Sequence, residues 1–293
     1  YDKIMRSVLI TGAFGQVGSV LSRIMYQDYE LTLTNRTIPP GEKGISLDIR
    51  NALALGEVIK AVQPDVIIHL AAMTSVDGCE LEPECAAEVN IAGVEHVCSE
   101  YSGHIIYLST DYVFNGKNGP YSETDPTDPI NVYGATKLAG ERILLENNPG
   151  HLVLRSNVVY DYNPNTQASF LNWVIQSLKN KQEIQVVHDQ INNPTWAESL
   201  ARVIELCIEK EICGVVHWGD ADYMNRLDFA VKIANTFDLN ADLIKPITTE
   251  ELNQPAQRPL NSGLKTDYLK SRLGITPPAV EECLVTIRDR ISQ

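Results

Sequence analysis

The sequence has few basic residues for its size and lacks any long apolar run. Lys and Arg number 24 against 38 Asp and Glu in 293 residues, which gives a formal net charge of −14. A nucleic-acid-binding protein needs a basic surface for the phosphate backbone, so we expect no nucleic-acid partner. No apolar run is long enough to cross a bilayer or to serve as a secretion signal, so we expect no membrane partner and a cytoplasmic location.

Closely spaced cysteine pairs are also absent. The six cysteines, at positions 79, 85, 98, 207, 213 and 283, form no CxxC motif, so we expect buried, reduced thiols. Apolar residues make up 44% of the chain and charged residues 21%, which excludes a disordered, collagen-like or coiled-coil protein. The composition is therefore that of an ordinary globular chain.

Short β-branched runs alternate with helical stretches in the first half of the chain. We expect strands at 7–11, 30–34, 66–70, 104–109 and 152–155, and helices at 16–27, 51–62, 83–101 and 132–146. This alternation predicts an α/β protein with a parallel sheet whose ligand lies at the carboxyl ends of the strands. After about residue 156 the pattern loosens, with helices expected at 170–179, 197–209 and 226–237, strands at 184–187 and 214–218, and few long elements from 246 onward.

This pattern predicts a Rossmann-type doubly wound parallel sheet with a smaller C-terminal substrate lobe. We assign 1–160 and about 184–217 to the NAD(P)-binding domain, and about 161–183 and 218–293 to the lobe.

A glycine-rich turn follows the first expected strand. Gly12, Gly15 and Gly18 stand at GxxGxxG spacing before a helix. Gly12 permits a tight turn, Gly15 lets the backbone approach a diphosphate, and Gly18 lets the helix pack on the strand. The spacing is typical of short-chain dehydrogenases and predicts a dinucleotide site, although a strand–turn–helix with small residues for packing gives the same pattern. The site would also include Phe14, Gln16 and Val17.

The end of the second expected strand carries a cation rather than an acid. Arg36 is the first charged residue there, and a guanidinium suits the 2′-phosphate of NADP(H). We therefore predict NADP(H) as the cofactor, with NAD(H) as the alternative; Arg36 would then be only a solvated loop residue. Asp48 and Ile49, after a short apolar run, are expected to meet the adenine ring unless Asp48 is simply a surface carboxylate.

Tyr133 and Lys137 form a YxxxK motif in a predicted helix. Four residues apart, the two side chains share one helix face. We expect the lysine cation to lower the pKa of the phenol from about 10, so that Tyr133 can exchange a proton near neutral pH. Thr110, at the end of the preceding strand, can hydrogen-bond the substrate oxygen that Tyr133 protonates.

Six segments carry a wider resemblance: TGAFGQVG (11–18), PDVIIHLAAMTSVDGCELEPE (64–84), STDYVFNG (109–116), PINVYGATKLAGE (129–141), DQINNPT (189–195) and QRPLNSGL (257–264). In this order they resemble the dTDP-4-dehydrorhamnose reductase family of extended short-chain dehydrogenase/reductases. The resemblance implies an NAD(P)H-dependent enzyme that reduces the C4 ketone of a nucleotide-linked 6-deoxyhexose. The first candidate reaction is conversion of dTDP-4-dehydrorhamnose to dTDP-L-rhamnose.

The resemblance also implies roles for single residues. Thr110, Tyr133 and Lys137 would be the catalytic trio, and Tyr133 and Lys137 would also touch the cofactor. Ala71 and Ala72 would line the cofactor, and the substrate side would comprise Thr74, Val76, Tyr112, Asn157 and Arg258. Asn157 stands where relatives often carry tryptophan, and Arg258 is expected either at the substrate diphosphate or in a structural ion pair. Carboxylates that bind a dimer-bridging metal in some members have no match here, so we predict no metal and leave a homodimer open.

Two other functions share these motifs. A nucleotide-sugar epimerase uses the same trio on the same fold, whereas a 4,6-dehydratase would need glutamate at the position of Tyr112. The regulatory β subunit of methionine adenosyltransferase resembles the same reductase family and binds NADP without turning over a sugar. The sequence therefore leaves an epimerase and a regulatory protein as alternatives to the reductase.

Overall fold

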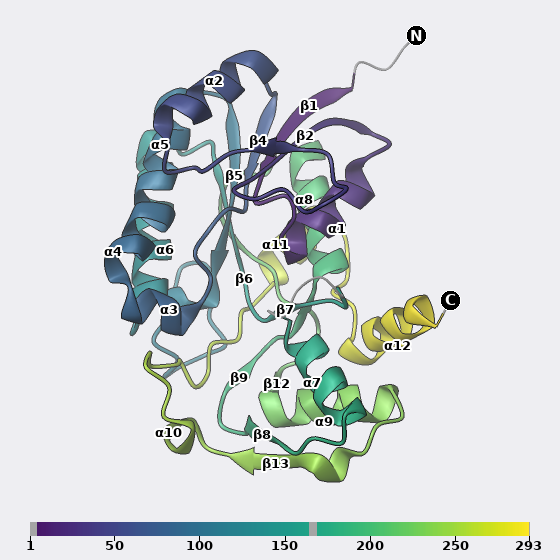
Figure 1. The fold of residues 1–293 in the computed structure, drawn as a ribbon. Coiled ribbons are helices and arrows are strands. Elements are labelled where there is room, and N and C mark those ends of the chain that lie inside the picture. The colour runs from purple at the N-terminus through teal and green to yellow at the C-terminus, as the bar shows by residue number, and fades with distance from the viewer. Residues whose placement is uncertain (1–4, 164–168, 293) are drawn as a thin grey trace.

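The computed structural model describes residues 5–163 and 169–292, and a seven-stranded sheet forms its centre (Figure 1). The strand order is β11-β6-β5-β4-β1-β2-β3, and every neighbouring pair is parallel. The order reverses direction between β1 and β4, which is where an open α/β sheet leaves a crevice for its ligand. The strands are β1 (Arg6–Thr11), β2 (Tyr29–Asn35), β3 (Ile45–Ser46), β4 (Val66–His69), β5 (His104–Thr110), β6 (Leu152–Ser156) and β11 (Gly214–His217).

Helices cover both faces of this sheet because its strands are apolar on both sides. Along β1, Val8 and Ile10 join one buried cluster and Leu9 joins the other, as the alternation of side chains along a strand requires. The first cluster is covered by α1 (Gln16–Met25), α8 (Ala197–Glu209) and α11 (Asp267–Leu273). The second is covered by α2 (Ala52–Val62), α5 (Gly93–Glu100) and α6 (Val132–Asn147). The predicted doubly wound α/β fold is thereby confirmed.

The connection from β4 to β5 is helical almost throughout. It consists of α3 (Val76–Leu81), α4 (Pro83–Ala87), a π-helical turn η1 (Glu88–Ala92) and α5. The helix expected at 83–101 is therefore present, but it contains an irregular turn that the sequence pattern does not reveal. Such π-helical turns occur frequently at functional sites.

A smaller lobe lies at the carboxyl ends of the sheet strands, in the lower part of Figure 1. Its buried cluster is formed by α7 (Phe170–Lys179), α9 (Arg226–Thr236), α12 (Val280–Ile291) and the parallel pair β8 (Ile184–Val187) and β13 (Ile244–Ile247). The short elements are η2 (Asp111–Val113), β7 (Val159–Tyr160), β9 (Ile191–Asn192), β10 (Thr195–Trp196), β12 (Met224–Asn225), η3 (Ala241–Leu243) and α10 (Thr249–Leu252).

The structure differs from the sequence-based expectations at three places. Strand β8 pairs with β13 in the lobe rather than joining the large sheet, although residues from 184 on were expected there. Helix α12 occupies a region where few long elements were expected. All six cysteines are free, but only Cys79, Cys207 and Cys283 are buried, whereas Cys213 is exposed. The proposed domain division, part of which falls in 164–168 outside the described residues, stays a prediction.

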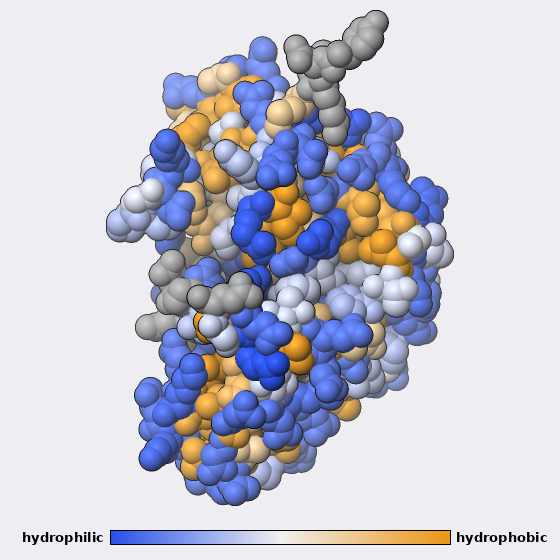
Figure 2. All heavy atoms as spheres, turned by 90° about the vertical axis from the view of Figure 1, so that its right-hand side faces the viewer, coloured by the Kyte–Doolittle hydropathy of each residue, from blue (hydrophilic) through white to orange (hydrophobic). Residues whose placement is uncertain are grey.

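Hydrophilic side chains cover most of the face shown in Figure 2, and hydrophobic ones form separate smaller patches. Among the described residues, no helix is both long enough and apolar enough to span a bilayer.

Candidate active site

The glycine turn after β1 lies against the residues that follow β4. Gly12 has a φ of +70°, and a Cβ there would lie 2.8 Å from the backbone nitrogen of Ala71. A side chain at this position would therefore meet both backbone strain and a steric clash. The Thr11 hydroxyl bonds His69 Nδ1 at 2.8 Å and accepts the Ala71 N–H at 3.3 Å, which ties the ends of β1 and β4 together. Ala71 and Ala72 are half-buried beside this turn.

The start of α1 has the properties of an anion site. Gly15 precedes the helix without a side-chain cap, and the first turn of α1 carries no acidic residue. The first N–H groups of a helix then remain available for a diphosphate. Val17 and Gly18 are buried, and a Cβ on Gly18 would lie 2.5 Å from the Gly12 carbonyl oxygen, so the helix packs as predicted. Phe14 and Gln16 are half-buried on either side of Gly15.

The ends of β2 and β3 bring the predicted adenosine residues together. Arg36 is exposed, and its charge acts on the nearby carboxylate of Asp48. Asp48 is held by the Arg50 guanidinium, with Arg50 Nη2 2.6 Å from Asp48 Oδ2. Hydrogen bonds from Arg50 lower the pKa of Asp48. Ile49 is buried, so this edge combines the exposed cation Arg36, a carboxylate paired with Arg50 and an apolar residue.

Thr110 and Tyr133 meet at the carboxyl end of β5. The Thr110 hydroxyl accepts the Tyr112 N–H at 3.1 Å and donates to Asp111 Oδ1 at 3.1 Å. The Tyr112 and Tyr133 rings pack edge to face with their centroids 5.8 Å apart. Burial raises the pKa of Tyr133 well above its usual value, and a hydrogen bond with Thr110 partly offsets this. Burial also raises the pKa of Asp111, to about 6.

Lys137 is buried one helical turn after Tyr133. Its Nζ lies 3.9 Å from the centroid of the Tyr107 ring, and burial lowers its pKa to about 7, although the charge of Glu141 opposes this. Lys137 is not among the main groups that shift the pKa of Tyr133. The expectation that the lysine cation lowers the phenol pKa is therefore wrong for this structure, because burial outweighs it.

Hydrogen bonds from three elements fix the catalytic helix α6. Asn131 caps it by accepting the Gly134 N–H at 2.8 Å, and Glu80 on α3 accepts the Val132 N–H at 3.0 Å. Asn90, in the π-helical turn η1, bonds both backbone groups of Met73 and donates to Thr136 on α6 at 3.1 Å. The amide of Asn90 therefore links the segment after β4 to the helix that carries Tyr133 and Lys137. Sequence reasoning missed Asn90, whose only signal is a polar residue inside a predicted helix.

The predicted substrate residues differ in how far they are exposed. Thr74 is exposed, and Val76 and Tyr112 are half-buried. Arg258 forms an ion pair with Asp77, with Arg258 Nη2 3.0 Å from Asp77 Oδ2. Asn157 is only 2% exposed, and its side-chain amide shares a hydrogen bond with the Thr195 hydroxyl at 3.3 Å. A direct contact between Asn157 and a substrate therefore stays a prediction.

Two charged residues that interact with these were not predicted. Asp77, at the start of α3, holds Arg258 and accepts the Ala256 N–H at 3.1 Å. Arg226, at the start of α9, acts electrostatically on Tyr112 and Asp111. Asp77 lies within the segment 64–84 that carries the family resemblance, whereas Arg226 lies outside all six segments. The sequence did not indicate the partner of either residue.

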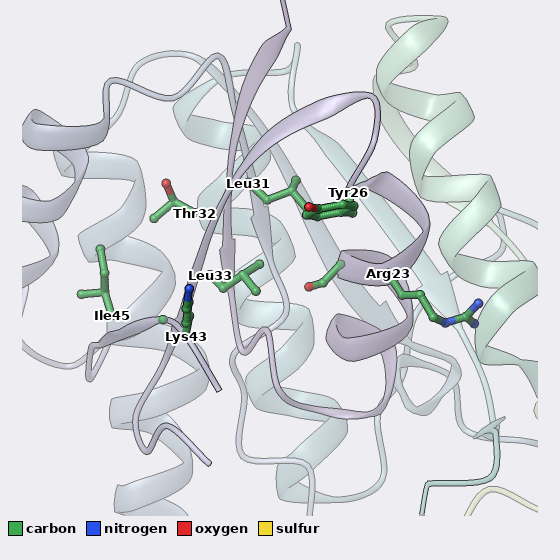
Figure 3. Close-up of a pocket in the computed structure, with 9 residues that line it drawn as sticks. Arg23, Tyr26, Leu31, Thr32, Leu33, Lys43 and Ile45 are labelled. Atoms are coloured by element: carbon green, nitrogen blue, oxygen red, sulfur yellow. The ribbon is translucent and has the colours of Figure 1, made fainter. Parts of the chain in front are cut away.

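A separate hollow of about 710 Å³ lies at the edge of the sheet between α1 and β2 (Figure 3). Leu31 and Leu33 of β2 and Tyr26 after α1 form its apolar wall, and Arg23 and Lys43 stand at its rim. None of the predicted catalytic residues lines this hollow.

The chain resembles known proteins over nearly its whole length. Residues 5–292 match the model of the family described as RmlD substrate binding domain. The chain is 34% identical to a dTDP-4-dehydrorhamnose reductase of Aggregatibacter actinomycetemcomitans, over 97% of this chain and 99% of that protein. It is 33% identical to methionine adenosyltransferase 2 subunit beta of Mus musculus, over 92% of this chain and 83% of that protein. A crystal structure of dTDP-4-dehydrorhamnose reductase from Bacillus anthracis in complex with NADP superposes with a TM-score of 0.90 at 30% identity, covering 99% of this chain and 100% of that one.

Proposed function

The chain belongs to the family of the RmlD substrate binding domain, and from this we propose that it is an NADPH-dependent reductase of a nucleotide-linked 4-keto-6-deoxy sugar. The substrate is dTDP-4-dehydrorhamnose and the product dTDP-L-rhamnose, in keeping with the name of the Aggregatibacter relative. The observation that carries the proposal is the packing of the Tyr133 ring on Tyr112, whose N–H bonds the Thr110 hydroxyl at the end of β5, with Lys137 one turn further along α6. The match over residues 5–292 confirms the family predicted from the sequence motifs.

The residues around the glycine turn fit a dinucleotide. Gly12 has no side chain and adopts a left-handed conformation, and the start of α1 has no side-chain cap and no acidic residue in its first turn. This arrangement leaves room and N–H donors for a diphosphate. Arg36 would bind the 2′-phosphate, and Ala71 and Ala72 would lie along the nicotinamide half. NADP is bound in the Bacillus anthracis relative. When bound, NADPH supplies the hydride that reduces the keto carbon.

The side chains of Thr110 and Tyr133 would donate a proton to the substrate carbonyl oxygen and stabilise the negative charge that develops on it. Tyr133 donates its phenolic proton to the carbonyl oxygen as that oxygen becomes negative. The Thr110 hydroxyl can turn its hydrogen from Asp111 to the same oxygen and stabilise it. Lys137, one helical turn after Tyr133, would hold the nicotinamide ribose of the bound cofactor.

Turnover with purified substrate tests the proposal. We expect NADPH to be consumed when dTDP-4-dehydrorhamnose is added, with dTDP-L-rhamnose identified by NMR. An isomerised sugar without net NADPH consumption would indicate an epimerase instead. Absence of NADPH consumption with dTDP-, UDP-, GDP- and CDP-linked 4-keto sugars would contradict a reductase of this class.

A second candidate function rests on the similarity to methionine adenosyltransferase 2 subunit beta. In that case the chain would bind NADP and regulate a partner enzyme without reducing a sugar. The distinguishing result would be tight NADP binding and co-elution with a methionine adenosyltransferase catalytic subunit whose rate it changes, in the absence of any sugar reduction.

A further inference from the structure

The ammonium group of Lys137 is buried without a carboxylate in direct contact. Lys137 is only 3% exposed. Within the described parts of the chain, its Nζ makes no hydrogen bond and no carboxylate oxygen lies within 4.0 Å of it. Glu141, one turn further along α6, acts on its charge from a distance, but this carboxylate already holds Arg155, with Arg155 Nη2 2.6 Å from Glu141 Oε2. A buried cation without a partner is costly, so another group must stabilise it.

The ring of Tyr107 on β5 is the group that touches this cation. Lys137 Nζ lies 3.9 Å from the centroid of the ring, well within the range of a cation–π contact. The negative face of an aromatic ring attracts a cation more strongly where water is excluded, and Tyr107 is only 1% exposed. The ring stabilises the charge without taking up the three N–H donors of the ammonium group in ordinary hydrogen bonds.

The Tyr107 ring is held in place by the sheet and by α6. Tyr107 lies directly opposite His69 on β4, and the two rings stack with their centroids 5.7 Å apart. His69 Nδ1 in turn bonds the Thr11 hydroxyl at 2.8 Å. On the helix side, a Cβ on Gly140 would lie 2.7 Å from the Tyr107 hydroxyl oxygen, so the glycine lets α6 approach the ring. The Tyr107 hydroxyl is buried and has no hydrogen-bond partner among the residues described, so the ring face makes the contact that matters here.

We propose that Tyr107 is a positioning residue of the active site, whose ring face keeps Lys137 charged and leaves its N–H groups free for the cofactor. The assignment rests on the proposed function, in which Lys137 holds the nicotinamide ribose. A carboxylate in the place of the ring would also stabilise the charge. It would, however, occupy the N–H groups in strong hydrogen bonds and compete with the ribose hydroxyls.

Lys137 is the member of this cluster that should change its charge near neutral pH. The titratable side chains around it are Tyr133 and Glu141 on α6, Tyr107 on β5, His69 on β4 and Cys79 on α3. Burial lowers the pKa of His69 to about 3, raises that of Cys79 to about 11 and raises the pKa values of both tyrosines. Burial lowers the pKa of Lys137 to about 7. Because the ring favours the ammonium form, weakening its attraction should lower the pH at which NADPH affinity falls.

Fluorination of the ring tests the contact with little change in its shape. Fluorine withdraws negative charge from the ring face, so the matched pair is Tyr107→Phe and Tyr107→trifluorophenylalanine in the full chain. We expect Tyr107→Phe to bind NADPH nearly as the wild type does, and the fluorinated variant to bind it about threefold to tenfold more weakly at neutral pH. In fluorescence titrations over a range of pH, the midpoint of the loss of affinity should lie about half to one pH unit lower for the fluorinated variant. Any titration of NADPH itself is common to both variants.

Two controls show whether the effect of fluorination passes through Lys137. In a Lys137→Met background the two rings should bind NADPH equally, because no cation is left to attract. The change Phe237→trifluorophenylalanine, at a half-buried ring at the end of α9 in the lobe, should alter neither the affinity nor the pH midpoint.

The remaining outcomes separate this inference from the proposed function. Equal affinities and equal pH midpoints for the two rings, in a chain that binds NADPH, would overturn the role of Tyr107 and leave the proposed function standing. An effect of fluorination that persists in the Lys137→Met background would also overturn it, since the ring would then act through packing alone. If the wild-type chain does not bind NADPH, the proposed function fails and the role of Tyr107 fails with it.

Discussion

The two sides of the candidate site are assembled in different ways. On the sheet side, Gly12, Ala71 and Thr110 follow directly from β1, β4 and β5, and Tyr133 lies on α6. On the other side, which we call the lobe side, the charged residues Asp77, Arg226 and Arg258 come from α3, α9 and an irregular loop. The first group is positioned by backbone pairing, and the second by contacts between segments far apart in the sequence.

This difference determines how each side should respond to mutation. Parallel strands keep their register through many backbone hydrogen bonds, so a single side chain on the sheet side can be changed without moving its neighbours. We therefore expect a mutation on the sheet side to change the reaction rate or cofactor binding without changing the stability of the protein. On the lobe side, ion pairs hold the functional side chains in place, so a mutation there should change ligand binding and protein stability together.

The largest effect is expected for Tyr133→Phe on the sheet side. Removing the phenolic proton donor should lower kcat by about 10²–10⁴-fold, the usual contribution of a positioned general acid. NADPH binding should remain, because α6 is fixed by its cap and by Glu80 and Asn90 rather than by the phenol. Single-turnover NADPH oxidation and fluorescence titration of NADPH measure the two quantities separately.

The variant Lys137→Met should behave differently from Tyr133→Phe. Since Lys137 is proposed to hold the ribose as well, both kcat and NADPH affinity should fall. Near-normal turnover of Tyr133→Phe would exclude Tyr133 as the acid. If both variants lost NADPH binding equally, residues on the sheet side would depend on one another as those on the lobe side do. This result would contradict the proposed difference between the two sides.

A smaller effect is expected for Arg36→Ala at the edge of the sheet. Loss of one guanidinium from a phosphate should weaken NADPH binding roughly tenfold to a hundredfold. NADH, which lacks the 2′-phosphate, should bind as before, because Asp48 stays neutralised by Arg50. Titration of both cofactors into the wild type, Arg36→Ala and the surface control Arg142→Ala measures this. A wild-type preference for NADH, or equal losses for both cofactors, would exclude the 2′-phosphate role.

The fold was predictable where local patterns decide it. The strands and helices of the first half were expected within a few residues, because buried apolar strands and amphipathic helices have clear periodicities. The strand expected at 184–187 is present as β8, but a short apolar run does not specify its partner, which is β13. Few long elements were expected from residue 246 onward, whereas helix α12 begins directly after Ala279.

The candidate site, like the fold, was predictable where local sequence patterns determine it. The YxxxK motif and the glycine spacing predicted Thr110, Tyr133 and Lys137 beside the cofactor turn, and strand ends of one parallel sheet necessarily lie near one another. Arg226 and Asp77 could not be predicted, since their partners depend on how the lobe packs on the sheet. The pKa of Tyr133 was predicted in the wrong direction because burial cannot be read from a four-residue spacing.

The smallest effect should arise where the two sides join, at Asp220 after β11. Its carboxylate is 1% exposed and accepts hydrogen bonds from Ser199 Oγ at 2.6 Å and the Trp196 N–H at 2.7 Å. Burial raises its pKa from 3.8 to about 7 in the folded protein. Between these values the unfolded chain loses the proton while the folded chain keeps it. The contribution of Asp220 to the unfolding free energy therefore falls as the pH rises through this window.

Asp220→Asn should remove this pH dependence while keeping the shape of the side chain. The unfolding free energy of the variant relative to the wild type should rise by at most about 1.4 kcal/mol per pH unit between about pH 4 and pH 7 and then level off. Urea unfolding at several pH values measures the difference, and Glu57→Gln, an exposed change on α2, should give a constant offset. If Asp220→Asn also gave a constant offset, the carboxyl would be ionised throughout. The hydrogen bonds from Ser199 and Trp196 would then be accepted by a charged carboxylate, like the contacts of the lobe side, rather than by a neutral buried carboxyl group.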